Sequence, residues 1–399
     1  MRQKKIGYML LMMWICFLGC RTPALGQSIE TPEVEKTEVQ KQQIIDYQVN
    51  FFNWDEINQL QEDLKGSMPS FTTFNLKEEV VGLIKGEKRF SLQTVLNAIG
   101  ILLFEEIGVF IKLGVRFILI VLLCNLLETL STSFKTKNTA KVSFFVCYIV
   151  VLYSVIQSFF IMVELARDAV DKMSGIMFAC IPSLLAFMTT SGYVSSAASI
   201  APVIIGGLNL STYVIKTIVF PCIVSIVVLD VISTMSDEFK IDKLIQLFYK
   251  SMKWALRAIV AISIGILSIY KMTLPYVDTT VKKAALNIST TFIPVIGDAV
   301  GGAVDFVVNC SFLVKNAFSV GVIIWIIVIV SLPLIKILAY VVVYHVAAAA
   351  IEPIGDKKMA HIATKLAKGC EFIMSSVGII TILCIVVLLI CISVGGNMI

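Results

Sequence analysis

The 399-residue chain is 57% hydrophobic and 15% charged, with a mean hydropathy of +0.88 and a formal net charge of +5. A soluble core cannot absorb this much apolar length, so the composition excludes an ordinary soluble globular protein. From about Ile107 to Ile399, apolar runs follow one another with short polar gaps. About 20 helical residues cross the ~30 Å hydrocarbon layer of a bilayer. We therefore expect an all-α, polytopic membrane protein.

The N-terminus has the pattern of a signal peptide. A basic stretch, Met1 to Lys5, precedes an apolar stretch from Ile6 to Cys20, and small residues follow at Ala24 and Gly26. This order is typical of a secretory signal. We predict a signal peptide over residues 1–26, cleaved before Gln27. An uncleaved anchor and lipoprotein processing at Cys20 stay open, and either cleavage places the following segment outside the cytoplasm.

Residues 27–105 differ sharply from the rest of the chain. Residues 27–100 contain 12 acids and 7 bases. Residues 27–50 are rich in Glu, Lys, Gln and Thr at their start and predict a disordered acidic tether. Apolar residues recur at helical spacing in Ile44–Leu64, Leu76–Ile84 and Phe90–Leu103. We expect a small helical extracytoplasmic segment over residues 51–105. It could pack as a subdomain, lie on the membrane or dock on a partner.

Residues 106–399 predict about eight transmembrane helices. The third and fourth are the weakest, because Pro182, Gly192, Pro202, Gly206 and Gly207 interrupt them. Seven spans plus a re-entrant hairpin is therefore the alternative. The expected spans are Ile107–Leu130, Val142–Leu165, Met173–Thr190, Ser195–Leu210, Thr212–Thr234, Ala255–Thr273, Phe318–Val343 and Phe372–Val394.

Loop charges set the expected orientation, because cytoplasmic loops carry an excess of Lys and Arg. Residues 131–141 hold three lysines and no acid, so we place them in the cytoplasm. Ala166–Lys172 balances two bases against two acids and fits an outside turn. Ser236–Lys253 also reads as an amphipathic helix on the cytoplasmic surface. With the lysines at 357–368 inside as well, eight spans put both termini outside.

The segment at about 276–317 resembles neither a clean span nor an ordinary loop. Gly297 and Gly301 form a G-x-x-x-G pattern, which lets helices approach closely in lipid. We interpret it as a hairpin that dips into the bilayer or lines a cavity, with a surface amphipathic hairpin as the alternative. The residues expected to line a path or support assembly here are Pro294, Gly297, Asp298, Gly301, Gly302, Asp305 and Lys315.

Charged residues within spans form a second group of candidates. Lys112 and Arg116 lie one turn apart in the first span, while Lys216 and Asp230 lie near the ends of the fifth. An ionisable residue inside a span is a functional-site hypothesis by default. Lys and Arg near a helix end also extend to the interface without any such role.

We find no pattern for enzymatic chemistry. The chain lacks a phosphate-binding G-x-x-x-x-G-K-[ST] loop, and its two histidines form no H-E-x-x-H motif. We expect no catalytic residue, no cofactor, no metal ligand and no nucleic-acid partner. Two interpretations follow from the residues alone: a transporter or channel subunit, or a membrane scaffold that recruits partners.

Six short motifs stand out by their order along the chain. These are the motifs at 182–186 (PSLLA), 218–221 (IVFP), 232–237 (ISTMSD), 292–297 (FIPVIG), 313–316 (LVKN) and 347–355 (AAAAIEPIG). In their order and spacing the chain resembles the stage III sporulation protein AE family over nearly its whole length. No single motif is diagnostic of chemistry.

The resemblance implies a membrane subunit of the stage III A complex in the mother-cell membrane around the engulfed forespore. Its implied partners are membrane lipid, other membrane subunits, a separate ATPase subunit and a forespore membrane protein across the intermembrane space. Together they would form a channel or secretion-like apparatus needed for forespore development after engulfment. A stand-alone secondary transporter or permease is the alternative. The resemblance does not say whether this subunit is a gate, a permease or a scaffold.

Overall fold

The computed structural model of the chain describes residues 42–50, 54–67, 75–85, 100, 108, 111–112, 114–115, 118–119, 137–235, 241–292, 294–353 and 357–394. The chain divides into two units, residues 1–44 and 45–399. Nearly all of the described residues belong to the second unit. The predicted signal peptide and most of the tether lie outside the described residues and stay predictions.

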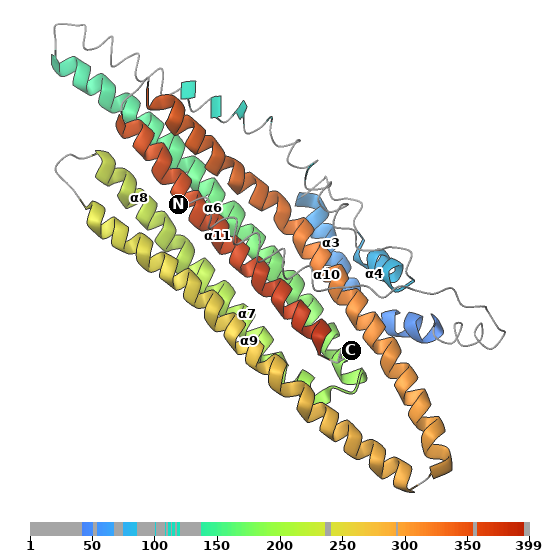
Figure 1. The fold of residues 1–399 in the computed structure, drawn as a ribbon. Coiled ribbons are helices and arrows are strands. Elements are labelled where there is room, and N and C mark those ends of the chain that lie inside the picture. The colour runs from blue at the N-terminus through green and yellow to red at the C-terminus, as the bar shows by residue number, and fades with distance from the viewer. Residues whose placement is uncertain are drawn as a thin grey trace. The chain divides into compact units, whose positions relative to one another are not determined.

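Every regular element in these described ranges is a helix, which confirms the all-α class (Figure 1). Two short helices come first, and long helices make up the rest. The elements are α3 (Trp54–Ser67), α4 (Leu76–Ile84), α6 (Lys137–Thr190), α7 (Val194–Val214), the π-helix η2 (Ile215–Val219), α8 (Phe220–Met235), α9 (Asp242–Phe292), α10 (Pro294–Ile351) and α11 (Lys357–Ser393).

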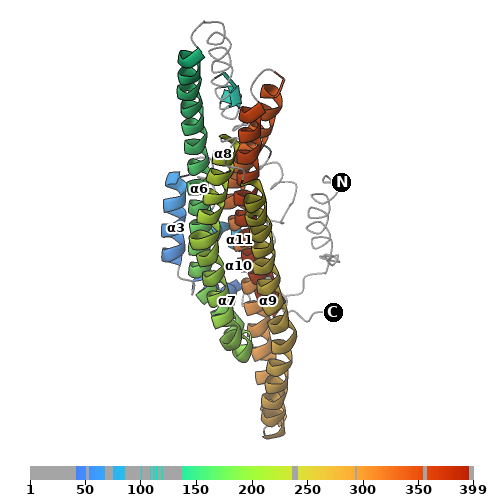
Figure 2. The same ribbon diagram turned by 90° about the vertical axis from the view of Figure 1, so that its left-hand side faces the viewer.

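Helix α11 is the centre of the bundle and contacts α6, α7, α8, α9 and α10. Figures 1 and 2 show α6, α10 and α11 side by side, with α7, α8 and α9 running along them. One face of α11 is buried throughout its length. Its members alternate at intervals of three and four residues, the spacing that keeps one helix face against its neighbours. They are Cys370, Ile373, Val377, Ile380, Cys384, Val387 and Cys391.

Five helices in the described residues are long and apolar enough to cross a membrane. They run over Leu152–Thr190, Val194–Thr234, Asp242–Tyr270, Asp305–Ile351 and Lys358–Ser393. The multi-pass helical architecture is therefore confirmed, whereas the predicted count of eight is not. Most of the first predicted span lies outside the described residues.

The predicted outside turn at Ala166–Lys172 is wrong, because α6 is helical from Lys137 to Thr190. The charged residues of this segment lie on a continuous helix, where acids and bases can pair with each other. Lys172 Nζ lies 2.8 Å from Asp168 Oδ2, one turn earlier. On the opposite face Ala166, Ala169 and Val170 are fully buried and continue the core.

Only Gly192 ends a helix among the interruptions expected between Pro182 and Gly207. Pro182 lies inside α6 and Pro202 inside α7. Gly192 has a φ of 85°, a left-handed conformation that glycine adopts without steric cost. The amides of Gly192 and Tyr193 donate to the carbonyls of Thr189 and Met188, both at 3.0 Å. This Schellman pattern closes α6 and turns the chain into α7.

The predicted N-terminal helical segment packs on the long helices. Leu76 and Val80 of α4 are fully buried against α10 at Gly321, where a Cβ atom would lie 2.9 Å from Val80 Cγ2. The ring centroids of Trp54 and Phe318 are 6.2 Å apart in an edge-on arrangement. Residues 45–50 are also helical, in agreement with the helical spacing that begins at Ile44.

Helices α9 and α10 meet where the sequence predicted a hairpin. Helix α9 ends at Phe292 and α10 begins at Pro294, a residue whose fixed φ suits the first turn of a helix. The two arms are 51 and 58 residues long and include residues that the sequence assigned to separate spans. The path-lining role of this hairpin stays a prediction.

Candidate membrane-embedded polar site

Lys216 lies on a π-helical segment inside a long apolar helix. The segment η2 joins α7 to α8 without a break, and the resulting helix, Val194–Thr234, is 41 residues long. Lys216 is therefore near the middle of a candidate span, whereas the sequence placed it near the end of one. A π-helical turn inserted in an α-helix is rare and is frequently found at functional sites.

The ammonium of Lys216 forms an ion pair with the carboxylate of Asp171 on α6. The side chains are partly exposed, 33% for Lys216 and 53% for Asp171. Asp171 belongs to the same helical stretch as the Asp168–Lys172 pair. Two acids and two bases from two helices thus meet at one level of the bundle, so each charge has an opposite charge beside it.

Hydroxyl groups extend this cluster across the bundle. The hydroxyls of Ser174 on α6 and Thr212 on α7 are 3.0 Å apart and share a hydrogen bond. The hydroxyls of Ser211 on α7 and Ser263 on α9 approach to 3.5 Å. We call this set the mid-bundle polar layer. Its members are Asp168, Asp171, Lys172, Ser174, Ser211, Thr212, Lys216 and Ser263.

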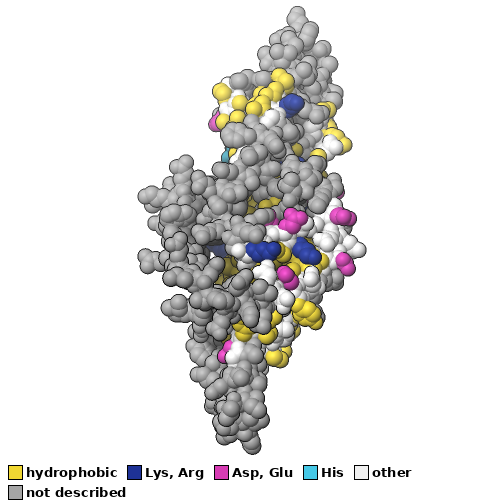
Figure 3. All heavy atoms as spheres, turned by 90° about the vertical axis from the view of Figure 1, so that its right-hand side faces the viewer, with side chains coloured by type: hydrophobic (Ala, Val, Ile, Leu, Met, Phe, Trp, Pro, Cys, Tyr) yellow, Lys and Arg dark blue, Asp and Glu magenta, His cyan; other side chains and the backbone are white. Residues whose placement is uncertain are grey.

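Helix α3 flanks the mid-bundle polar layer on the α6 side. Gly175, next to Ser174, faces Leu60, whose Cδ2 would lie 3.9 Å from a Cβ at that position. The outer side of α3 is polar, with Asp55, Asn58 and Glu62 exposed. On the side where α3 and α4 lie, acidic and basic side chains gather near the middle of the view (Figure 3). Polar surface therefore lies close to the layer.

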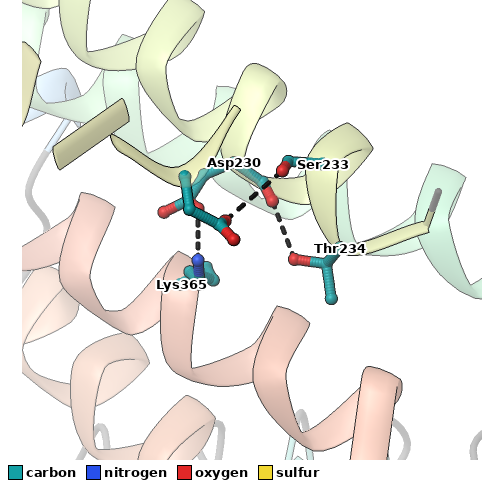
Figure 4. A network of polar contacts seen from close by, with 5 residues as sticks. Asp230, Ser233, Thr234 and Lys365 are labelled. Carbon is teal, nitrogen blue, oxygen red and sulfur yellow. Dashed lines mark hydrogen bonds and ion pairs between the residues drawn. The ribbon is translucent and has the colours of Figure 1, made fainter. Parts of the chain in front are cut away.

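A second polar cluster joins α8, α9 and α11. Asp230 on α8 is 1% exposed and forms an ion pair with Lys365 on α11 (Figure 4). Thr234 Oγ1 donates to the Asp230 carbonyl at 2.8 Å, and Ser233 Oγ lies 3.4 Å from Asp242 Oδ1 at the start of α9. This cluster connects the end of α8, the beginning of α9 and α11.

Aromatic side chains lie close to that ion pair. The rings of Tyr249 on α9 and Phe372 on α11 are stacked with centroids 5.3 Å apart. The ammonium of Lys368 lies 3.5 Å from the Tyr249 ring centroid, a cation–π contact. Lys365 thus contacts the Asp230 carboxylate, and Lys368 contacts the Tyr249 ring.

The structure separates residues that the sequence grouped around the α9–α10 hairpin. Lys315 is fully buried, donates to the carbonyl of Val394 and lies 4.8 Å from the Phe312 ring centroid. Asp305 is exposed. Lys315 is thus not beside water, because it binds a carbonyl at the C-terminus of α11, and the path-lining role expected for it stays a prediction.

The other predicted site residues do not converge on one place. Pro294, Gly297, Asp298 and Gly301 lie in the first turns of α10, and their side chains fall outside the described residues. Gly302 is exposed, with no atom within 4 Å of a Cβ placed there.

Of the two candidates in the first predicted span, Lys112 alone belongs to the described residues. Lys112 is exposed, and Gly114 beside it faces Val343 of α10. Arg116 lies outside the described residues. The functional role expected for Lys112 and Arg116 therefore stays a prediction.

Sequence reasoning missed the Asp171–Lys216 pair, although a signal was present. Glu164, Arg167, Asp168, Asp171 and Lys172 follow helical intervals of three and four residues, with no helix breaker among them. Such spacing favours a continuous helix over a loop.

Comparison with known proteins agrees with the membrane architecture. The family model of stage III sporulation protein AE matches residues 74–395. The stage III sporulation protein AE of Bacillus subtilis (strain 168) is 29% identical over 342 residues, which cover 86% of each chain. No solved structure matches. The chain therefore belongs to the stage III sporulation protein AE family and is a multi-pass membrane protein with a role in sporulation.

Proposed function

We propose that the chain is a membrane subunit of a multiprotein channel or secretion-like apparatus that links mother cell and forespore during endospore formation. The apparatus would be needed for forespore development after engulfment. The family match supports the sporulation part of the proposal. The observation that carries the channel part is the Asp171–Lys216 ion pair in the middle of two long apolar helices, with Lys216 on a π-helical turn.

A helix that only anchors a protein in the membrane does not require an ion pair or a π-helical turn near its middle. Charged side chains within apolar spans are costly, and they mark substrate or ion pathways when they face a cavity or pair with one another. The mid-bundle polar layer contains two such pairs and two hydroxyl contacts, drawn from α6, α7, η2 and α9. A layer of this kind supports a gate better than an anchor.

The proposed partners rest on membership of the stage III sporulation protein AE family. They are the other membrane subunits of the stage III A complex, among them a separate ATPase subunit, and a forespore membrane protein. The chain would lie in the mother-cell membrane with its N-terminal segment in the intermembrane space. The polar outer sides of α3 and α4 suit this aqueous environment.

Deletion and complementation in a spore-forming host test the proposal. We expect arrest after engulfment in the deletion strain and rescue by the wild-type gene. Lys216→Met should fail to rescue, while Lys243→Met, at an exposed position on α9, should rescue. The two variant proteins must reach equal levels in the membrane.

Two outcomes would contradict the proposal. Normal sporulation in the deletion strain would favour a stand-alone transporter. Full rescue by Lys216→Met would show that the mid-bundle polar layer is not needed for function.

A further inference from the structure

An exposed stripe on α6 repeats the periodicity of a helix–helix seam. Its residues are spaced alternately by four and three positions, and each is exposed. They are Tyr153, Gln157, Phe160, Glu164, Arg167 and Asp171, which we call the α6 stripe. The buried face of α11 has the same spacing and is covered by neighbouring helices. An alternation of three and four is the pattern of a left-handed helix pair.

Lipid alone does not suit the whole stripe. Tyr153 and Phe160 are 67% and 50% exposed and would fit an apolar surrounding. One to two turns further along the same face come Glu164 and Arg167, both exposed. Charged groups that face lipid within a span are costly, so a protein partner with matching charges is the better cover.

The charges of the α6 stripe on one copy complement those of the same stripe on a second copy. Asp171 is neutralised by Lys216, which leaves one acid, Glu164, and one base, Arg167. Copies inserted in the same direction are related by an axis along the membrane normal, so their α6 helices run parallel. Equal-numbered residues then face each other. Arg167 of one copy lies one turn from Glu164 of the other, and the reverse pair forms by symmetry.

We propose that a second copy of this chain docks through the α6 stripe, with the two α6 helices parallel. Tyr153 and Phe160 supply the apolar contact, and the Glu164–Arg167 pairs fix the register. Gln157 meets its counterpart at the seam, where a polar residue specifies alignment at some cost in stability. The proposal does not depend on the channel role.

Cysteine crosslinking of the full chain tests the geometry. The protein is expressed in a host that does not sporulate, so that other sporulation proteins are absent. Gln157→Cys should form a disulfide-linked dimer on oxidation in membranes. The parent chain with its native cysteines and Ser375→Cys, an exposed position on α11, are the controls and should form none. Equal crosslinking of Ser375→Cys and Gln157→Cys would overturn the proposal.

Charge exchange tests the register independently. Two differently tagged copies are expressed together, and one tag is captured after solubilisation. Glu164→Arg or Arg167→Glu alone should lower recovery of the second tag several-fold, and the double exchange should restore it. No recovery of the second tag with wild-type chains at normal levels, or recovery unchanged by both single variants, would overturn the proposal and assign the stripe to lipid or another protein.

Discussion

Lys216 on η2 forms an ion pair with Asp171 on α6, although each residue lies near the middle of its own long helix. Residues 45 positions apart are thereby joined at one level of the bundle. Because both side chains are charged, removal of either one leaves the other without its neutralising partner.

Removal of one member of this pair should be worse than removal of both. We expect Lys216→Met and Asp171→Asn each to lower the thermal stability of the purified protein slightly, because each leaves a lone charge in a pair that is only partly buried. The double variant should be more stable than either single variant. Melting temperatures in detergent measure this, and additive losses in the double variant would show that the two residues do not interact.

Asp230→Ala should destabilise the protein strongly. Asp230 is 1% exposed and neutralises Lys365, so its loss leaves a part-buried ammonium unpaired. Breaking a buried ion pair costs about 3–5 kcal/mol in free energy of unfolding. Asp168→Ala is the matched control, because Asp168 is 51% exposed and an exposed pair contributes only about 0–1 kcal/mol. Denaturant titration compares them, and similar losses would contradict the structure.

Gly321→Leu should push α4 away from α10. A Cβ at position 321 would lie 2.9 Å from Val80 Cγ2, so a larger side chain has no room there. We expect thiol labelling of Val80→Cys, which is buried in the wild-type background, to rise in the Gly321→Leu background. Gly378→Leu on α11 is the control, because nothing lies within 4 Å of its Cβ position. Unchanged labelling would show that α4 does not pack there.

Lys315→Met should loosen the C-terminus of α11. Lys315 donates to the Val394 carbonyl, one of the terminal helix carbonyls that lack a partner within the helix. We expect faster amide hydrogen exchange over residues 390–394, while exchange near Thr381 stays unchanged. Mass spectrometry of exchanged peptides measures both regions. Equal exchange in wild type and variant would contradict this role.

Labelling with a charged, membrane-impermeant thiol reagent tests the predicted path at the α9–α10 hairpin. Cysteines replace Asp298, Gly302, Asp305 and Lys315 one at a time in a background without reactive native thiols. We expect Gly302→Cys and Asp305→Cys to react, because both positions are exposed, and Lys315→Cys to resist. Failure of all four to react would count against an aqueous surrounding for this segment.

The sequence was sufficient for the helical membrane class and for the short helices α3 and α4. Apolar length and helical spacing are local properties, and both elements follow from them. It was insufficient at Ala166–Lys172, where balanced charges suggested a loop. Asp168 pairs with Lys172 one turn away, and Asp171 pairs with Lys216 on another helix. The second partner depends on tertiary packing, which spacing along one helix does not contain.

Lys315 is a second case in which local sequence does not predict the surroundings of a charged side chain. The sequence grouped it with Asp298 and Asp305 on a hairpin expected to line a cavity. In the fold α10 lies against α11, and the last carbonyls of α11 offer Lys315 a partner away from water. Burial of a lysine is decided by which helix end lies beside it, and no pattern within α10 encodes that.

Helix α10 is longer than a membrane crossing requires. Its 58 residues extend ~87 Å at ~1.5 Å per residue, whereas a bilayer with its headgroups is only ~40–45 Å thick. At the tilts usual for membrane helices, about 0–40°, a straight helix of this length extends beyond one bilayer crossing. We expect the part of α10 that lies beyond the bilayer, together with the adjoining arm of α9, to act as a spacer between the membrane surface and a neighbouring component.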